Sequence, residues 1–171
     1  MRETILSATV LALALTGDAL LYVVLPAHAA DFGVDLALVG ILLSANRIIR
    51  IFGYGAVVAI GERLGARRLS LLAAAAAAAT TFAYGFGSCF AQLLAGRLGW
   101  GLAFAALNLT SLVYAASVKT APVRSVGLAS AIRQSGPTLA MAGGAALVPF
   151  TGPQGIFVAL GCRSEEHTSE L

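Results

Sequence analysis

The sequence predicts an all-helical membrane protein, and three observations lead to that class. The 171 residues are 58% hydrophobic and only 11% charged, whereas soluble domains carry about 25% charged residues. The apolar residues fall in blocks of roughly 20, which is the length of helix that crosses about 30 Å of hydrocarbon. These blocks also lack the period-two alternation that a membrane β-barrel requires. Helices therefore remain as the structure in which all backbone N–H and C=O groups are hydrogen-bonded within lipid.

The first two apolar blocks are separated by a short polar link. The first helix is expected at about residues 5–26, where Asp18 is the only charged residue. The first block is too long for a cleavable signal peptide and is expected to be a membrane helix itself. After the link, the second helix is expected at about residues 36–60, and it carries Arg47 and Arg50.

A compact charged loop at residues 61–68 leads into the third helix, expected at about residues 69–86. Its seven consecutive alanines, 73–79, favour a thin helix that neighbours can approach closely. The fourth helix is expected at about residues 91–118, after a tight turn.

A link at residues 119–127 precedes the fifth helix, expected at about residues 128–149. Proline in a helix interior removes a backbone hydrogen bond, so Gly136 and Pro137 predict a kink there. A sixth helix is expected to begin near residue 156.

Basic residues separate completely between alternate links, which predicts the orientation. By the positive-inside rule, links rich in Lys and Arg lie in the cytoplasm. The N-terminus is therefore expected inside, in a multi-pass protein of the cell's inner membrane. The other links contain no Lys or Arg. The basic positions are Arg2, Arg63, Arg67, Arg68, Lys119 and Arg124.

Ionisable residues inside the expected spans are candidate functional groups. Each costs roughly 2.5–3.5 kcal/mol at a helix centre, so such groups normally face a cavity or a partner. Asp18 and Arg97 both lie ~10 Å below the outer surface when depth is counted along their helices, which predicts an ion pair. Two roles stay open for this pair: a protonatable coupling group, or a static structural contact. Arg133 lies nearer a helix end, where a long side chain can reach the interface.

Further polar side chains share helix faces with these charges. Arg97, Phe104, Asn108 and Ser111 follow helical spacing, and Arg47 and Arg50 are one turn apart. Four arginines thus stand against one carboxylate within the spans. A cavity lined by several of them would be electropositive and would favour an anionic small molecule.

Several other classes of function are disfavoured. The basic residues are scattered among apolar blocks and form no basic face of the kind that binds nucleic acid. Cys89 and Cys162 lack metal-ligand spacing, so neither a metal site nor another cofactor is expected. His28 has no neighbouring catalytic partner, and no enzymatic activity is expected.

The last nine residues, RSEEHTSEL at positions 163–171, interrupt the sixth apolar segment just after it begins. They match the translation of a common sequencing-library adapter, and the alternative is a genuine polar C-terminus. The adapter interpretation predicts that residues 1–162 are a truncated chain, so the tail is left out of the fold.

The loop between the second and third helices resembles the cytoplasmic loop motif of the major facilitator superfamily. The resemblance rests on Arg63, Gly65, Arg67 and Arg68, within a loop that begins at Gly61. Glu62 stands where the family has an aspartate, and Val58 stands at the family's first glycine.

Two further segments resemble the same family. Arg97 and Gly101 are similar to its fourth-helix motif, and Gly136–Pro137 is similar to its fifth-helix antiporter motif without the glycine pair that follows. The resemblance implies a twelve-helix secondary transporter of which this chain is the N-terminal half, with a small-molecule substrate, protons as a coupling ion and the C-terminal half as its partner. The alternative is a small multi-pass membrane protein with a scaffold or assembly role.

Overall fold

The computed structural model describes residues 2–118 and 122–160, except for the side chains of residues 122 and 144–147. Every regular element in this part is a helix, which confirms the predicted all-helical class. A further helical stretch occupies residues 155–160. The elements are α1 (Arg2–Ala27), the 3-10 helix η1 (Ala29–Phe32), α2 (Leu36–Leu64), α3 (Ala66–Tyr84), α4 (Phe90–Ala116) and α5 (Pro122–Thr151).

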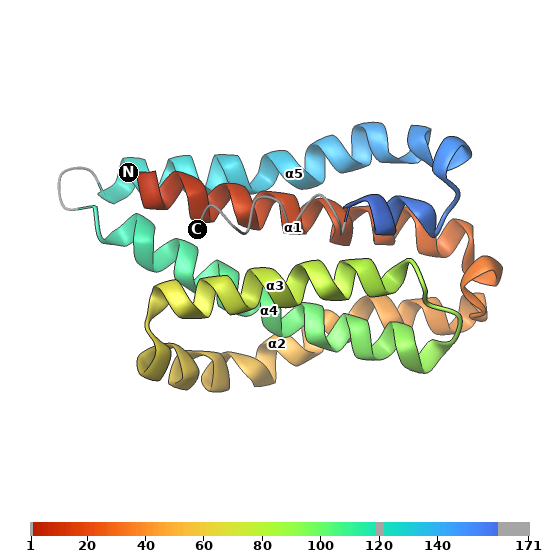
Figure 1. Ribbon diagram of the computed structural model, residues 1–171, viewed down its shortest axis with the longest axis horizontal. Helices are drawn as coiled ribbons and strands as arrows, with labels where there is room; N and C mark the ends of the chain where they lie inside the picture. Colours follow the sequence, from red (N-terminus) through yellow and green to blue (C-terminus); the bar gives the residue numbers. More distant parts are fainter. Residues whose placement is uncertain (1, 119–121, 161–171) are drawn as a thin grey trace.

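The five long helices lie side by side along the long axis of the molecule (Figure 1). Helix α1 packs mainly on α5, whereas α2 and α3 pack mainly on α4. Helix α4 also contacts α1 and α5, so it joins the two groups. The α2–α3 turn lies at the same end of the bundle as the N-terminus, and η1 lies at the opposite end.

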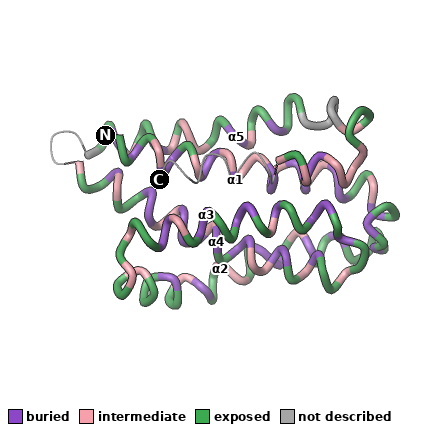
Figure 2. The backbone as a smooth tube through the Cα atoms, viewed as in Figure 1, coloured by how far each residue is buried: buried purple, intermediate pink, exposed green. Residues whose placement is uncertain are grey.

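Buried apolar side chains follow the bundle from end to end. At the η1 end, Phe157 packs edge-on against Phe32 and Tyr84, with ring centroids 6.2 Å and 6.0 Å away. The alanine face of α3 packs in the middle cluster against α4, as its thin profile predicts. Figure 2 shows buried residues along α1, α3 and α4 and exposed residues on the outward sides of α2 and α5.

The outward side of α2 is apolar as well as exposed. Ile51 and Phe52 are 75% and 79% exposed, and Ile48 is 53% exposed. Large exposed apolar surfaces on a helix of this length suit contact with lipid or another protein rather than with water.

Three of the described helices, α1, α2 and α4, are long and apolar enough to cross a membrane. This finding is compatible with a membrane location. Helix α3 is only 19 residues long and carries Arg67 and Arg68 in its first turn. Both α3 and α5 are less apolar on average than α1, α2 and α4.

The loop predicted at residues 61–68 is wrong in extent, because helix occupies almost all of it. Helix α2 continues to Leu64, and α3 begins at Ala66. Gly65 alone makes the turn, with a φ of 79° that residues with a Cβ rarely adopt. Glu62 and Arg63 are good helix formers, so the charge that suggested a loop is equally compatible with a helix end.

The start predicted for the fifth helix is also wrong. Helix α5 begins at Pro122, six residues before position 128, and continues to Thr151. Proline fits the first turn of a helix because its ring presets φ and no partner is needed for a missing N–H. The helix passes through Pro137 without interruption. Residues 119–121, together with Cys162 and the proposed adapter tail at 163–171, lie outside the described residues.

Candidate functional site

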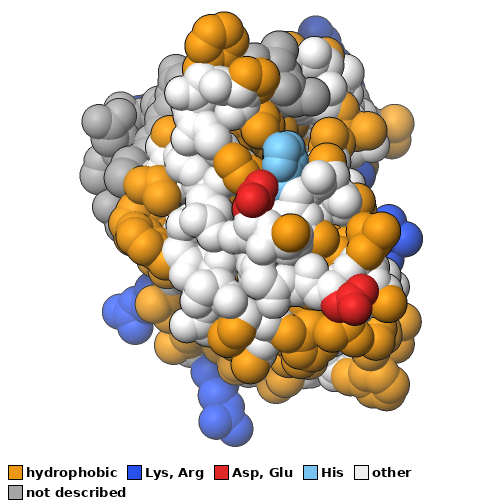
Figure 3. Space-filling view, turned by 90° about the vertical axis from the view of Figure 1, so that its right-hand side faces the viewer, with side chains coloured by type: hydrophobic (Ala, Val, Ile, Leu, Met, Phe, Trp, Pro, Cys, Tyr) orange, Lys and Arg blue, Asp and Glu red, His pale blue; other side chains and the backbone are white. Residues whose placement is uncertain are grey.

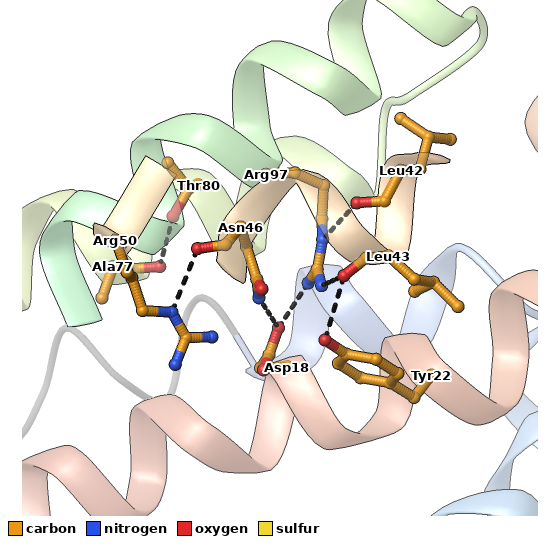
Figure 4. A network of polar contacts seen from close by, with 9 residues as sticks. All are labelled: Asp18, Tyr22, Leu42, Leu43, Asn46, Arg50, Ala77, Thr80 and Arg97. Atoms are coloured by element: carbon orange, nitrogen blue, oxygen red, sulfur yellow. Dashed lines mark hydrogen bonds and ion pairs between the residues drawn. The ribbon is translucent and has the colours of Figure 1, made fainter. Parts of the chain in front are cut away.

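Asp18 and Arg97 form an ion pair in the middle of the bundle (Figure 4). The guanidinium Nη1 of Arg97 donates to Oδ1 of Asp18. Arg97 is 0% exposed and Asp18 is 6% exposed. The pairing predicted from the depths of the two residues is therefore confirmed, and it joins α1 to α4.

Helix α2 supplies the other partners of this pair. Asn46 donates from Nδ2 to Asp18 Oδ1 over 3.2 Å. Arg97 donates from Nε to the carbonyl of Leu42 over 3.2 Å and from Nη2 to that of Leu43 over 3.3 Å. A helical carbonyl has a second lone pair that can accept such a bond. The network consequently fixes α1, α2 and α4 at one point.

Gly101 allows α2 and α4 to approach closely enough for this network. A Cβ at Gly101 would lie 2.8 Å from the Asn46 carbonyl oxygen and 3.2 Å from the Asn46 Cα. Only glycine fits against backbone at that distance. Gly101, singled out from the fourth-helix motif, thus lies one turn from Arg97 and packs directly on Asn46.

The two arginines of α2, Arg47 and Arg50, lie over aromatic rings. The guanidinium carbon of Arg50 lies 4.0 Å from the ring centre of Phe104, and its Nε donates to the Asn46 carbonyl over 3.1 Å. The guanidinium carbon of Arg47 lies 5.8 Å from the ring centre of Tyr22. These distances are in the range of cation–π contacts.

The polar stripe of α4 continues through Asn108. Asn108 donates from Nδ2 to the Tyr54 hydroxyl over 3.0 Å, and its Oδ1 accepts from Arg133 Nη1 over 2.7 Å. The Arg133 side chain therefore bonds to the bundle rather than reaching only for the helix end. Arg50 and Arg133 are linked through Phe104 and Asn108, which are one turn apart on α4.

A cavity of about 290 Å³ lies beside the ion pair, between α1, α2 and α5. Neither of the hydrogen bonds that described side chains make to Asp18 reaches its Oδ2, and Asp18 lines the cavity. The lining residues are Leu15, Asp18, Ala19, Tyr22, Arg47, Pro137 and Met141. In the described part of the chain, no three His, Cys, Asp or Glu side chains are grouped so that they could hold a metal ion.

The loop-motif residues lie away from this cavity, at the α2–α3 turn (Figure 1). Gly61 and Glu62 line a separate cavity of about 270 Å³ with Thr110 of α4. Arg63 and Arg68 are exposed at this end of the bundle.

The opposite end of the bundle carries acidic side chains and the histidine (Figure 3). His28 Nδ1 lies 3.1 Å from Asp31 Oδ2, and Asp35 caps α2 by accepting from the Ala37 amide over 2.9 Å. In Figure 3 the basic side chains are at the margins of this end.

Three contributors to the site were not predicted from the sequence. Asn46 directly precedes Arg47 in the sequence, but its bond to Asp18 was not predicted. Tyr22 and Tyr54 were missed altogether. Tyr22 lies one turn after Asp18 on α1, and Tyr54 one turn after Arg50 on α2, so helical spacing from a charged residue could have found both.

A scan against protein-family models finds no family that matches this chain. A search of curated proteins also finds no significant match.

Proposed function

We propose that this chain is the N-terminal, membrane-embedded part of a secondary transporter of the major facilitator type. All five long helices would cross the inner membrane, with the N-terminus in the cytoplasm. A small solute would pass by alternating access, driven by an ion or by protons. The chain is not proposed to be an enzyme.

One observation carries this proposal: a buried ion pair beside a cavity, within helices apolar enough to span a membrane. Intramembrane charges are expensive and typically mark substrate or proton pathways. Among the described residues Asp18 is the one carboxylate that lines this cavity, and no described side chain donates a hydrogen bond to its Oδ2.

The arrangement suits a proton-operated contact. A proton entering from the cavity would bind Asp18 Oδ2 and remove the negative charge that faces Arg97. The Coulomb attraction between α1 and α4 would then fall, while Arg97 would keep its carbonyl partners on α2. Protonation would in this way loosen one helix contact without leaving the guanidinium unbonded.

The orientation is tested through Cys89, an exposed free cysteine between α3 and α4. In a Cys162→Ser background, a membrane-impermeant maleimide should label Cys89 in intact spheroplasts. Arg68→Cys, placed in a chain with both native cysteines changed to serine, should be labelled only after the membrane is made permeable. The reverse pattern would show an inverted chain.

The transporter proposal itself is tested by sequencing the native locus past codon 162 without library adapters. We expect the reading frame to continue through the sixth helix, a cytoplasmic linker and six further helices. If the genomic DNA instead encodes RSEEHTSEL followed by a stop codon, the transporter proposal fails, and a small multi-pass scaffold protein takes its place.

The coupling role of Asp18 is tested with Asp18→Asn in the complete gene product. The protein is reconstituted in liposomes with an entrapped pH indicator and exposed singly to monocarboxylates, amines and sugars. We expect at least one solute to move protons with the native protein and none to do so with Asp18→Asn, although the variant inserts normally. Asn retains an oxygen that can accept a hydrogen bond from Arg97. If the variant still fails to fold, the pair has a structural role.

A further inference from the structure

The cavity beside Asp18 joins a cationic side to an apolar side. Arg47 of α2 and Asp18 of α1 provide its charged groups. The apolar side chains lie on α1 and α5. They are Leu15, Ala19, Pro137 and Met141. A volume of about 290 Å³ is at the lower end of the range for small-molecule pockets, which are mostly apolar with a few polar groups that fix orientation.

Arg47 is the group in this cavity that has bonding capacity to spare. Its guanidinium lies over the Tyr22 ring and makes no ion pair or hydrogen bond with any described residue. A guanidinium presents donors in a planar fork that matches the two oxygens of a carboxylate. By contrast, each of the three guanidinium nitrogens of Arg97 already donates a hydrogen bond, to Asp18 or to a backbone carbonyl.

The position of Arg47 on α2 places it beside both polar and apolar side chains. Arg47, Arg50 and Tyr54 follow i, i+3 and i+7 spacing and share one face. Arg47 is itself exposed, and Ile51, which is 75% exposed, follows it by one turn. Arg47 therefore lines the cavity where the polar face of α2 meets its exposed apolar surface.

The charge of the cavity lining comes from two residues, Arg47 and Asp18. Arg97 pairs with Asp18, whereas Arg47 has no carboxylate within ion-pair distance in the described part of the chain. Arg47 therefore leaves one uncompensated positive charge at the cavity, which would repel a cation and attract an anion.

We propose that this cavity binds a small organic monocarboxylate. The carboxylate would bond to Arg47, and the apolar body of the ligand would lie against Leu15 and Met141. The inference rests on the proposed transport function, because it names the class of solute that this half of the carrier would hold. An inorganic anion such as phosphate would leave the apolar wall unused, so the cavity fits it less well.

The test is equilibrium dialysis of radiolabelled benzoate against the purified chain in nanodiscs of neutral lipid. We expect saturable binding of benzoate to the native chain and weaker binding, by roughly tenfold or more, to Arg47→Gln, because the variant loses a charge-assisted bidentate contact. Arg47→Lys should keep the charge without the fork and should fall between the two.

Matched controls separate this site from general electrostatics. Arg124→Gln removes one positive charge at an exposed position in the first turn of α5 and should bind benzoate like the native chain. Benzyl alcohol and benzylammonium, which share the ring of benzoate but lack its negative charge, should not compete. Circular dichroism of each variant should report the native helix content.

Either of two results would overturn the inference: equal benzoate binding by the native chain and Arg47→Gln, or competition by benzylammonium stronger than that of unlabelled benzoate. Binding is measured here without transport, so the two proposals fail separately. Benzoate binding in a protein whose complete gene moves no solute would remove only the transporter proposal. Transport without benzoate binding would remove only the monocarboxylate site.

Discussion

Asp18→Leu should lower the free energy of unfolding by about 3–5 kcal/mol, the usual cost of removing one partner of a buried ion pair. The variant leaves the guanidinium of Arg97 inside the bundle without its counter-charge, and an arginine cannot relieve this by losing its proton. Trp100 is the single tryptophan and is 0% exposed. Its fluorescence during a titration with sodium dodecyl sulfate in mixed micelles therefore measures the loss directly.

Two further variants test this explanation. Arg97→Leu should cost less than Asp18→Leu, because a carboxyl group left alone can take up a proton and become neutral. The double variant Asp18→Leu/Arg97→Leu should recover most of the stability, since no buried charge remains. A double variant that is as unstable as Asp18→Leu would show that packing, and not charge, holds α1 against α4.

Gly136→Val should separate α1 from α5 and lower the free energy of unfolding by about 3 kcal/mol, the upper part of the range for overpacked sites. A Cβ at Gly136 would lie 2.7 Å from the carbonyl carbon of Ala12 and 3.1 Å from its Cα, and closer still to the carbonyl oxygen. These are backbone atoms, so no rotamer change can relieve the overlap. The same fluorescence titration measures the effect.

Gly143→Val on the same helix is the matched control. No atom of the described residues lies within 4 Å of a Cβ built at Gly143, so this variant should keep nearly native stability. Both variants add the same side chain to one helix, and helix propensity changes equally in the two. Equal losses would show that the effect comes from propensity and that the contact between Gly136 and Ala12 is unimportant.

The contrast between these two glycines also shows what small residues in a sequence can predict. Small residues in membrane helices suggest close helix contacts, and Gly53, Gly101 and Gly136 do lie against neighbouring helices. Gly55 and Gly143 have no described neighbour within 4 Å of a Cβ built on them. A glycine in a sequence indicates that a close approach is possible, but only the rotation of its helix decides whether one occurs.

Apolar blocks and depth along a helix gave correct predictions, because each can be read from the sequence of a single helix. They predicted the all-helical class and the pairing of Asp18 with Arg97. Lateral neighbours depend on how several helices pack together. For this reason the sequence did not predict Asn46 as the third member of the network, or Phe104 as the ring beneath Arg50.

Link boundaries were the other weak point. Charge at residues 62 and 63 and a proline at 122 suggested loops, but the structure places all three in helices. Both features are compatible with helix ends, where backbone groups already lack intrahelical partners. Gly65, the residue that breaks the helix, was recognised as part of a motif and not as a turn in itself.

The sequence distance between Asp18 and Arg97 sets an order of events during biosynthesis. Arg97 follows Asp18 by 79 residues, so at 5–20 residues per second it leaves the ribosome roughly 4 to 16 s later. For a chain inserted as it is made, α1 enters the bilayer before its counter-ion exists. Helix α1 must either stay in the translocon until α4 is synthesised or enter the bilayer with Asp18 protonated. Loss of Arg97 would accordingly leave the insertion of α1 intact and weaken the later packing of α4 on α1.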